Sequence, residues 1–153
     1  MSEPRELRTS YELFHVECGP GWKGLYIPLL KLCEVYGISV VQVKEKFGGL
    51  RFYTGGYVDP TRAMEEILPP DLLDIINAAE VTSYHICEDC GVSGVEHWDD
   101  ERKPVYKVKT GRSRTSGWIR SLCDTCREAL DQRREAEEAK VRARLAAKES
   151  TGE

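Results

Sequence analysis

The chain has 153 residues, of which 41% are hydrophobic and 31% charged, and no apolar run approaches the roughly 18 residues that cross a bilayer. The net charge of −4 is unevenly placed, because residues 63–100 hold ten acidic and no basic side chains, whereas residues 101–120 hold seven basic side chains and one acidic side chain. These values exclude a membrane protein, a large enzyme, a disordered chain and a uniformly basic protein that coats nucleic acid, and they confine any nucleic-acid contact to a local surface. Residues 1–14 lack the apolar segment of a secretory signal, so we expect a cytoplasmic protein.

Residues 22–37 predict the first helix. Apolar side chains recur at helical spacing from Trp22 to Tyr36, and Gly37 is of the type that commonly ends a helix. Pro28 lacks a backbone N–H and is tolerated in a first turn, so we expect the helix proper to begin near Ile27.

The next segment predicts a β-hairpin with two different faces. Residues 39–46 and 50–54 are strand-like runs, joined by the short turn of Phe47, Gly48 and Gly49. One face would pack inward with Val41, Val43, Leu50 and Phe52, and the other would carry Gln42, Lys44, Lys46, Arg51 and Tyr53. Three cations beside a tyrosine can hold a phosphate backbone and stack a base, although an ordinary solvated face has the same composition.

Two helices are expected before the first cysteine pair. Asp59 and Pro60 supply an N-cap and a first-turn proline, and a second helix starts at Asp71 after two prolines. Their apolar residues are core material to which we assign no chemistry. Cys18 and Cys33 are predicted to be buried thiols.

The strongest signal is a pair of C-x2-C motifs, Cys87/Cys90 and Cys123/Cys126, separated by 32 residues. Each motif offers two sulfur ligands from one turn, and a structural zinc site needs four at tetrahedral angles. Gly91 suits the tight turn after the first pair. Two disulfides or four free thiols are the alternatives, and disulfides are disfavoured in a cytoplasmic chain. The spacing therefore predicts one structural Zn²⁺.

The elements around the two motifs predict a treble-clef zinc finger. Residues 105–109 alternate as a strand, residues 110–113 supply a turn, residues 117–122 form the returning strand, and the chain is helical from Asp124. A zinc ribbon is the competitor, but its second cysteine pair would lie on a hairpin. In a treble clef the second pair lies in the first turn of the helix, whose N–H groups favour thiolates.

The same arrangement occurs in nucleases, but the residues for catalysis are absent. The helix over 124–148 contains no His and no Asn, and no His lies on the predicted strands. His97 with Asp99 and Asp100 has the pattern of a solvated acidic loop. We therefore predict that the protein is not an enzyme.

The C-terminal helix should project from the finger. Leu130, Val141 and Leu145 are its only large aliphatic residues, which is too thin a stripe for a strong coiled coil. The helix is therefore either solvated or the contact of a homodimer or partner. The fold class predicted is α+β, with an α+β unit over 1–84, a treble-clef-like zinc module over 85–148 and a disordered tail over 149–153.

The order of motifs resembles that of small uncharacterised phage and prophage proteins. The run over 42–53 follows an upstream Cys-Gly-x-Gly-Trp (Cys18 to Trp22), and it precedes a CxxCG turn (Cys87 to Gly91) and a Gly-Trp-x-x-x-Leu-Cys segment (Gly117 to Cys123). The resemblance covers roughly residues 15–127. It implies a phage or prophage product that acts in a bacterial cytoplasm, and no activity.

Two functions remain open from the sequence. The first is DNA or RNA binding through a basic hairpin, for which the candidates are Lys107, Lys109, Arg112, Arg114 and Arg120, with Lys44, Lys46 and Arg51 on the other hairpin. Lys107 and Lys109 would share one strand face, and Arg112 and Arg114 would lie at the turn. The second is a protein-interaction module, an inhibitor or adaptor of a host complex, which uses the acidic 63–100 surface or the long helix.

Overall fold

The computed structural model describes residues 16–62 and 68–152. The prediction for residues 1–14 and the start of the acidic block at 63–67 therefore lie outside the described residues. In chain order the elements are β1 (Val16–Glu17), the 3-10 helix η1 (Pro20–Trp22), α2 (Lys23–Tyr36), β2 (Ile38–Lys46), β3 (Gly49–Tyr57), the 3-10 helix η2 (Pro60–Arg62), α3 (Pro70–Ser83), β4 (Val95–Trp98), β5 (Pro104–Tyr106), β6 (Val108–Ser113), β7 (Ser116–Cys123) and α4 (Asp124–Ser150).

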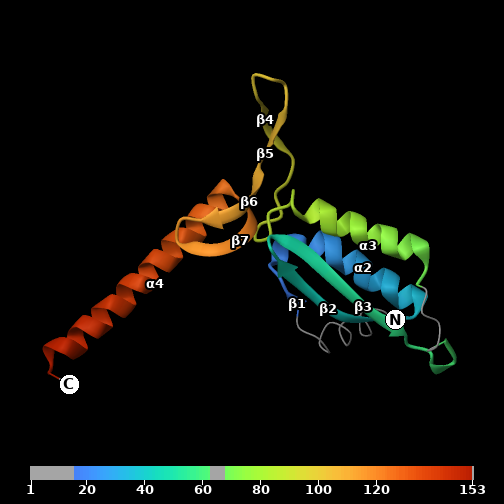
Figure 1. Cartoon of the computed structure of the whole chain (residues 1–153), viewed down its shortest axis with the longest axis horizontal. Helices are drawn as coiled ribbons and strands as arrows, with labels where there is room; N and C mark the ends of the chain where they lie inside the picture. The colour runs from blue at the N-terminus through green and yellow to red at the C-terminus, as the bar shows by residue number, and fades with distance from the viewer. Residues whose placement is uncertain (1–15, 63–67, 153) are drawn as a thin grey trace, which may run out of the picture.

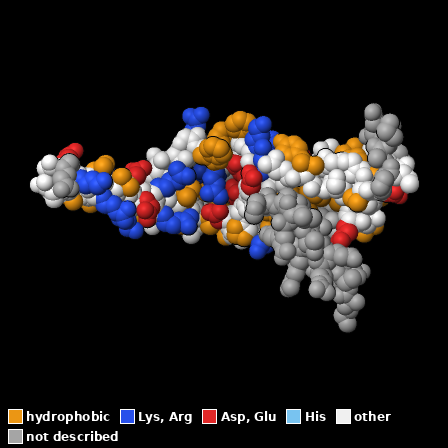
Figure 2. Space-filling view, turned by 90° about the horizontal axis from the view of Figure 1, so that it is seen from below, with side chains coloured by type: hydrophobic (Ala, Val, Ile, Leu, Met, Phe, Trp, Pro, Cys, Tyr) orange, Lys and Arg blue, Asp and Glu red, His pale blue; other side chains and the backbone are white. Residues whose placement is uncertain are grey.

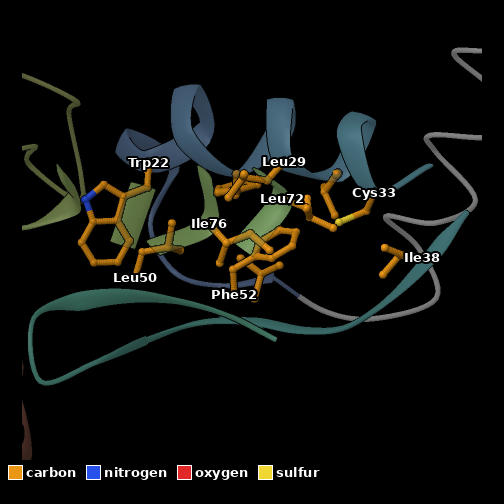
Figure 3. Close-up of a cluster of buried hydrophobic side chains, with 11 residues drawn as sticks. Trp22, Leu29, Cys33, Ile38, Leu50, Phe52, Leu72 and Ile76 are labelled. Carbon is orange, nitrogen blue, oxygen red and sulfur yellow. The ribbon is translucent and has the colours of Figure 1, made fainter. Parts of the chain in front are cut away.

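The N-terminal half is a three-stranded sheet covered by two helices. The strand order is β1-β2-β3, with β1 parallel and β3 antiparallel to β2. Helices α2 and α3 pack side by side on one face of this sheet (Figure 1). Figure 3 shows the core between the helices and the hairpin, with Trp22, Leu29, Leu50, Phe52 and Leu72 among its members, all 4% exposed or less. Burial of these large side chains supplies most of the stability of this half.

Helix α2 begins earlier than the sequence predicts. It starts at Lys23 directly after η1, so Pro28 lies inside the helix and not in its first turn. The proline removes one backbone hydrogen bond to the residue four positions earlier, and burial of Tyr26 and Leu29 against the core outweighs that loss. The predicted stop is confirmed, because Gly37 has φ of 67° and its N–H bonds to the carbonyls of Cys33 and Glu34.

The predicted hairpin is confirmed, with one correction on its inner face. Val43 lies opposite Phe52, and both are buried, but Val41 is 60% exposed. The register shifts between Val40 and Gln42, so the alternation of side chains changes there, and Val40 and Ile38 face the core in place of Val41.

Between the two cysteine motifs the chain forms two hairpins, where the sequence predicted one. The strand expected over 105–109 is divided, because β5 pairs with β4 while β6 pairs with β7, and Lys107 lies between them. The expected turn over 110–113 belongs to strand β6, and the turn lies at Arg114 and Thr115. The segment around His97, expected to be a loop, is strand β4, and the β4–β5 hairpin projects from the molecule (Figure 1).

The order of first cysteine turn, hairpin β6–β7 and helix α4 is that of a treble clef, so the α+β class and the zinc-finger arrangement are confirmed. Helix α4 extends away from the rest of the molecule and continues to Ser150, beyond the start predicted for the disordered tail (Figure 1). Among the described helices, none is long and apolar enough to cross a bilayer.

Candidate functional site

The four predicted ligands come together at the start of α4. The sulfur atoms of Cys87, Cys90, Cys123 and Cys126 all lie within 4.8 Å of one another, and the distance between the Sγ atoms of Cys90 and Cys123 is 3.8 Å. Tetrahedral zinc with Zn–S bonds of about 2.3 Å needs sulfur atoms about 3.8 Å apart. The donor set and its spacing therefore fit Zn²⁺.

Local backbone geometry explains why these sulfur atoms converge. The Cys87 turn is closed by a hydrogen bond from Gly91 N–H to the Cys87 carbonyl at 2.9 Å, and Gly91 has φ of 81°, which favours glycine. Cys123 is the N-cap of α4, and its sulfur accepts from the Cys126 N–H at 3.5 Å. The turn and the helix N-terminus thus each present two sulfur atoms.

The pKa values of two thiols in the cluster are shifted in opposite directions. Burial raises the pKa of the Cys87 thiol, but backbone N–H groups of Cys90, Cys123 and Asp89 outweigh it, so this pKa lies below its ordinary value. Burial raises the pKa of the Cys126 thiol, and hydrogen bonds with the other three sulfur atoms raise it further. A thiol cluster of this kind binds metal with release of protons, and the four sulfur atoms fill a tetrahedral shell without a position for water. Such a four-sulfur shell is typical of structural zinc sites.

The other two cysteines are not part of the cluster. Cys33 is buried in the N-terminal core, and burial raises its pKa to about 11. Burial also raises the pKa of Cys18 to about 12, with a further contribution from the charges of Glu88 and Glu45. Cys33 is buried as predicted, whereas Cys18 is only partly buried. Neither belongs to the four-cysteine cluster found among the described residues.

The cysteine turn rests directly on the N-terminal half. The Gly21 N–H donates to the Glu88 carbonyl at 2.7 Å, and the Trp22 indole N–H donates to the Ile86 carbonyl at 2.8 Å. A Cβ atom at Gly21 would lie 2.1 Å from the Cys87 carbonyl oxygen, so only glycine allows this approach. The Cys-Gly-x-Gly-Trp motif is therefore the platform for the first cysteine turn.

Arg120 and Arg114, both predicted nucleic-acid contacts, are engaged in ion pairs within the chain. Arg120 pairs with Glu88 at 3.1 Å and Asp89 at 2.9 Å, next to the cysteine turn. Arg114 pairs with three carboxylates along α4, those of Glu128, Asp131 and Glu135. These two arginines hold β7 to the cysteine turn and the β6–β7 turn to α4, respectively, which makes them structural.

Asp131 should make the contact between hairpin and helix sensitive to acid. The hydroxyl of Thr115 lowers the pKa of this 3% exposed carboxyl, with help from Ser113, the Thr115 N–H and Arg114. Because the folded pKa is depressed, the contribution is complete above the ordinary Asp pKa of about 3.9 and is lost as pH falls through the lower folded value. We expect Asp131→Asn to lower the melting temperature at pH 6 and to have a smaller effect below pH 4. A pH series of thermal unfolding on both proteins measures this, and an equal effect at all pH values would contradict it.

A groove of about 450 Å³ lies where the β2–β3 turn meets the β6–β7 hairpin. Its lining includes Lys44, Glu45, Lys46, Phe47, Arg112 and Trp118. The two aromatic rings are 64% exposed at Phe47 and 63% exposed at Trp118. In the central region of the face shown in Figure 2, between α4 and the N-terminal half, hydrophobic, basic and acidic side chains lie next to one another.

Backbone strain marks one of these aromatic residues. Phe47 has φ of 52°, in the left-handed region, and Gly48 beside it has φ of 83°. A two-residue hairpin turn of this type strongly favours Asn or Gly at the first position, and a bulky residue there costs on the order of 1–3 kcal/mol. Sequence reasoning treated Phe47 only as part of a turn, and the run Phe-Gly-Gly between strands was the available signal.

The structure brings together some of the predicted nucleic-acid contacts and separates the others. Lys44 and Lys46 share the groove with Arg112, although they come from different hairpins. Arg51 lies opposite Lys44 on β3 and donates to the Leu50 carbonyl and the Tyr84 hydroxyl. Lys109 pairs with Asp124. Lys107 and Lys109 do not share a strand face, because Lys107 lies outside both strands.

One structural residue escaped the sequence reasoning. Arg127 in the first turns of α4 donates to the carbonyls of Lys109, Gly111 and Arg120, and so joins the helix to both strands of the hairpin. Nothing in the local sequence distinguishes this arginine from the other charged residues of the helix.

Comparison of the chain with protein-family models, with curated proteins and with solved structures gives no match. What the structure establishes is a four-cysteine cluster that can bind a metal, in an α+β protein of treble-clef arrangement.

Proposed function

We propose that this chain is a noncatalytic nucleic-acid-binding module, stabilised by one structural zinc ion, that binds phosphates at the groove between its β2–β3 and β6–β7 hairpins. The main support is the convergence of Lys44, Lys46 and Arg112 on one hollow of the surface. Glu17 and Glu45 line the same groove, and the ammonium groups of Lys44 and Lys46 lie 5.6 and 5.8 Å from the ring centroids of Tyr53 and Phe47. Within the described part of the chain none of the three cations forms an ion pair, so the groove keeps one positive charge in excess for phosphates.

The phosphate contacts proposed for the groove are not those of the basic hairpin predicted from the sequence. Arg114 and Arg120 would have to exchange their carboxylate partners for phosphates. This exchange would cancel most of the favourable free energy of a phosphate contact. Lys44 and Lys46 lie on the β2–β3 hairpin, outside the basic segment over 101–120. Of the cations in that segment, Arg112 lines the groove. The groove cations therefore replace the hairpin as the phosphate contacts.

The order of the motifs also supports a phage or prophage origin. The resemblance to phage and prophage proteins favours a phage product that acts in a bacterial cytoplasm. The glycines of the shared motifs lie where the two halves meet, at Gly21 against the cysteine turn and at Gly48 against β6 and β7. Because these glycines allow the close contact between the two halves, proteins that share the motifs would be expected to share this architecture.

A protein partner is the second candidate, favoured by the acidic surface. Exposed carboxylates lie on α3 at Asp71 and Asp74 and on the β4–β5 hairpin at Asp99 and Asp100. Trp98 on that hairpin is 63% exposed. An inhibitor or adaptor of a host complex would use this surface or α4, which is also where a homodimer would form.

The test is binding of the zinc-loaded protein to DNA and RNA over a salt series by fluorescence anisotropy. We expect Lys44→Glu with Lys46→Glu to reduce affinity at least tenfold and to flatten the dependence of affinity on salt. Lys23→Glu with Lys31→Glu, the same charge change on α2, is the control and should have a small effect. Absence of binding at low salt, or equal loss in both double variants, contradicts the proposal and favours the protein partner.

A further inference from the structure

The two exposed rings of the groove, Trp118 and Phe47, are placed as stacking surfaces. They occupy the two hairpins that form the groove, and cations flank them at Lys44, Lys46 and Arg112. Large aromatic faces left in water next to cations are the pattern of sites that bind nucleic acid through both base and phosphate.

Trp118 is held in position from one edge. Its indole N–H donates to both oxygens of the Glu45 carboxylate, at 3.1 and 3.2 Å, and Glu45 also accepts from the Gly48 N–H at 3.1 Å. The carboxylate thus connects the indole of one hairpin to the turn of the other. The ring is positioned before any ligand binds, yet 63% of it remains exposed. Pre-positioning of this kind reduces the ordering that binding requires.

A second hollow, of about 360 Å³, continues past Trp118. It shares Glu17, Glu45 and Trp118 with the groove, and its other lining residues are Glu88, Arg134 of α4 and Arg120, which is paired with Glu88 and Asp89. Trp118 therefore lines both hollows, with Lys44, Lys46 and Arg112 in the first and Arg134 in the second. Because three carboxylates line the second hollow, we expect phosphates to contact the cations of the first hollow.

We infer that the ligand is a single strand, bound with one base stacked on Trp118 and a neighbouring base on Phe47. In a duplex the bases stack on one another, and their faces are not accessible to side chains, whereas a single strand can present them. Glu45 is a positioning residue for the indole. This inference rests on the proposed function, since it names the class of nucleic acid that the groove takes.

The experiment compares a labelled single strand of about 15 nucleotides with its duplex, on the zinc-loaded protein. We expect the single strand to bind at least tenfold more tightly. Trp118→Ala should weaken single-strand binding roughly 5- to 150-fold and leave the duplex almost unchanged. Trp98→Ala is the matched control, since Trp98 has the same 63% exposure but does not line the groove.

Fluorescence provides a readout that a merely structural role would not change. The three tryptophans are Trp22, which is fully buried, Trp98 and Trp118, so a Trp98→Phe protein keeps one exposed indole. Binding of the single strand should quench that indole. In the same protein Glu45→Ala and Glu45→Gln remove the same charge from the groove, but only Glu45→Gln keeps an acceptor for the indole. We therefore expect stronger quenching and tighter binding in Glu45→Gln than in Glu45→Ala, and equal values would show that Glu45 does not position the indole.

The outcomes test the stacking inference and the phosphate groove separately. Salt-dependent binding that is equal for single strand and duplex, or unaffected by Trp118→Ala, would overturn the stacking inference and leave the phosphate groove standing. Absence of salt-dependent binding to either form would overturn the inference together with the proposed function.

Discussion

Removal of the metal is expected to unfold the C-terminal half of the chain and to leave the N-terminal core folded. Among the described residues the second hydrophobic cluster has four buried members, Cys87, Val108, Leu122 and Cys123, and two of these are predicted metal ligands. Zinc binding supplies about 10–16 kcal/mol in zinc-finger peptides, far more than so small a core can replace. The first cluster has eleven buried members and none of the ligands.

Hydrogen exchange with and without a chelator measures this prediction. Protection should be lost across β6, β7 and the first turns of α4, and kept in α2 and in the β2–β3 hairpin. Cys123→Ser should give the same pattern and reduce bound zinc from one ion per chain to none. Cys18→Ala is the control and should keep the full zinc content, since Cys18 is outside the cluster. Loss of protection throughout the chain would mean that the two halves unfold together.

A single methyl group at Gly21 is expected to separate the two halves. The added Cβ would meet three backbone atoms, the carbonyl oxygens of Cys87 and Glu88 and the N of Gly91, at 2.1, 2.6 and 2.6 Å. Backbone atoms held by the metal turn cannot move away as a flexible side chain does. We therefore expect Gly21→Ala to lower the free energy of unfolding of the zinc-loaded protein by about 3 kcal/mol or more.

Gly24, three residues further on, provides a control at which alanine should increase the stability. It lies in helix α2, and nothing comes within 4 Å of a Cβ placed there. Gly24→Ala should stabilise the protein by roughly 0.5–1 kcal/mol, because alanine favours the helix. Urea unfolding of the three proteins with zinc in excess gives both values. Equal stability of Gly21→Ala and the unchanged chain would show that the close approach is absent in solution.

Gly48 and Gly49 give the β2–β3 turn, in the motif over residues 42–53, a role in tertiary packing. A Cβ at Gly48 would lie 2.7 Å from the Thr110 methyl, and the Ser121 hydroxyl donates to the Gly48 carbonyl at 2.5 Å. A Cβ at Gly49 would lie 2.4 Å from the Tyr84 ring. The turn is therefore a contact between the N-terminal hairpin and the zinc module, which places Phe47 beside Trp118 in the groove.

Local signals in the sequence determined the elements and the ligands. The two C-x2-C motifs identified four sulfur atoms that the structure holds within 4.8 Å, because each motif forms its own turn or helix start. Gly37 ended α2, and the two glycines after Phe47 predicted the β2–β3 turn. Such features depend on residues a few positions apart, for which spacing alone carries the information.

Tertiary contacts decided what the charges do. Arg114 and Arg112 lie two residues apart in a basic segment, yet Arg114 pairs with three carboxylates of α4 while Arg112 lines the groove with lysines from the other hairpin. The bulge beside Val41 and the division of the strand at Lys107 were likewise invisible, since strand pairing between distant residues sets the register. The sequence by itself determined the metal ligands and the treble-clef order, whereas the groove exists only because the cysteine turn docks on Gly21 and brings two separate hairpins together.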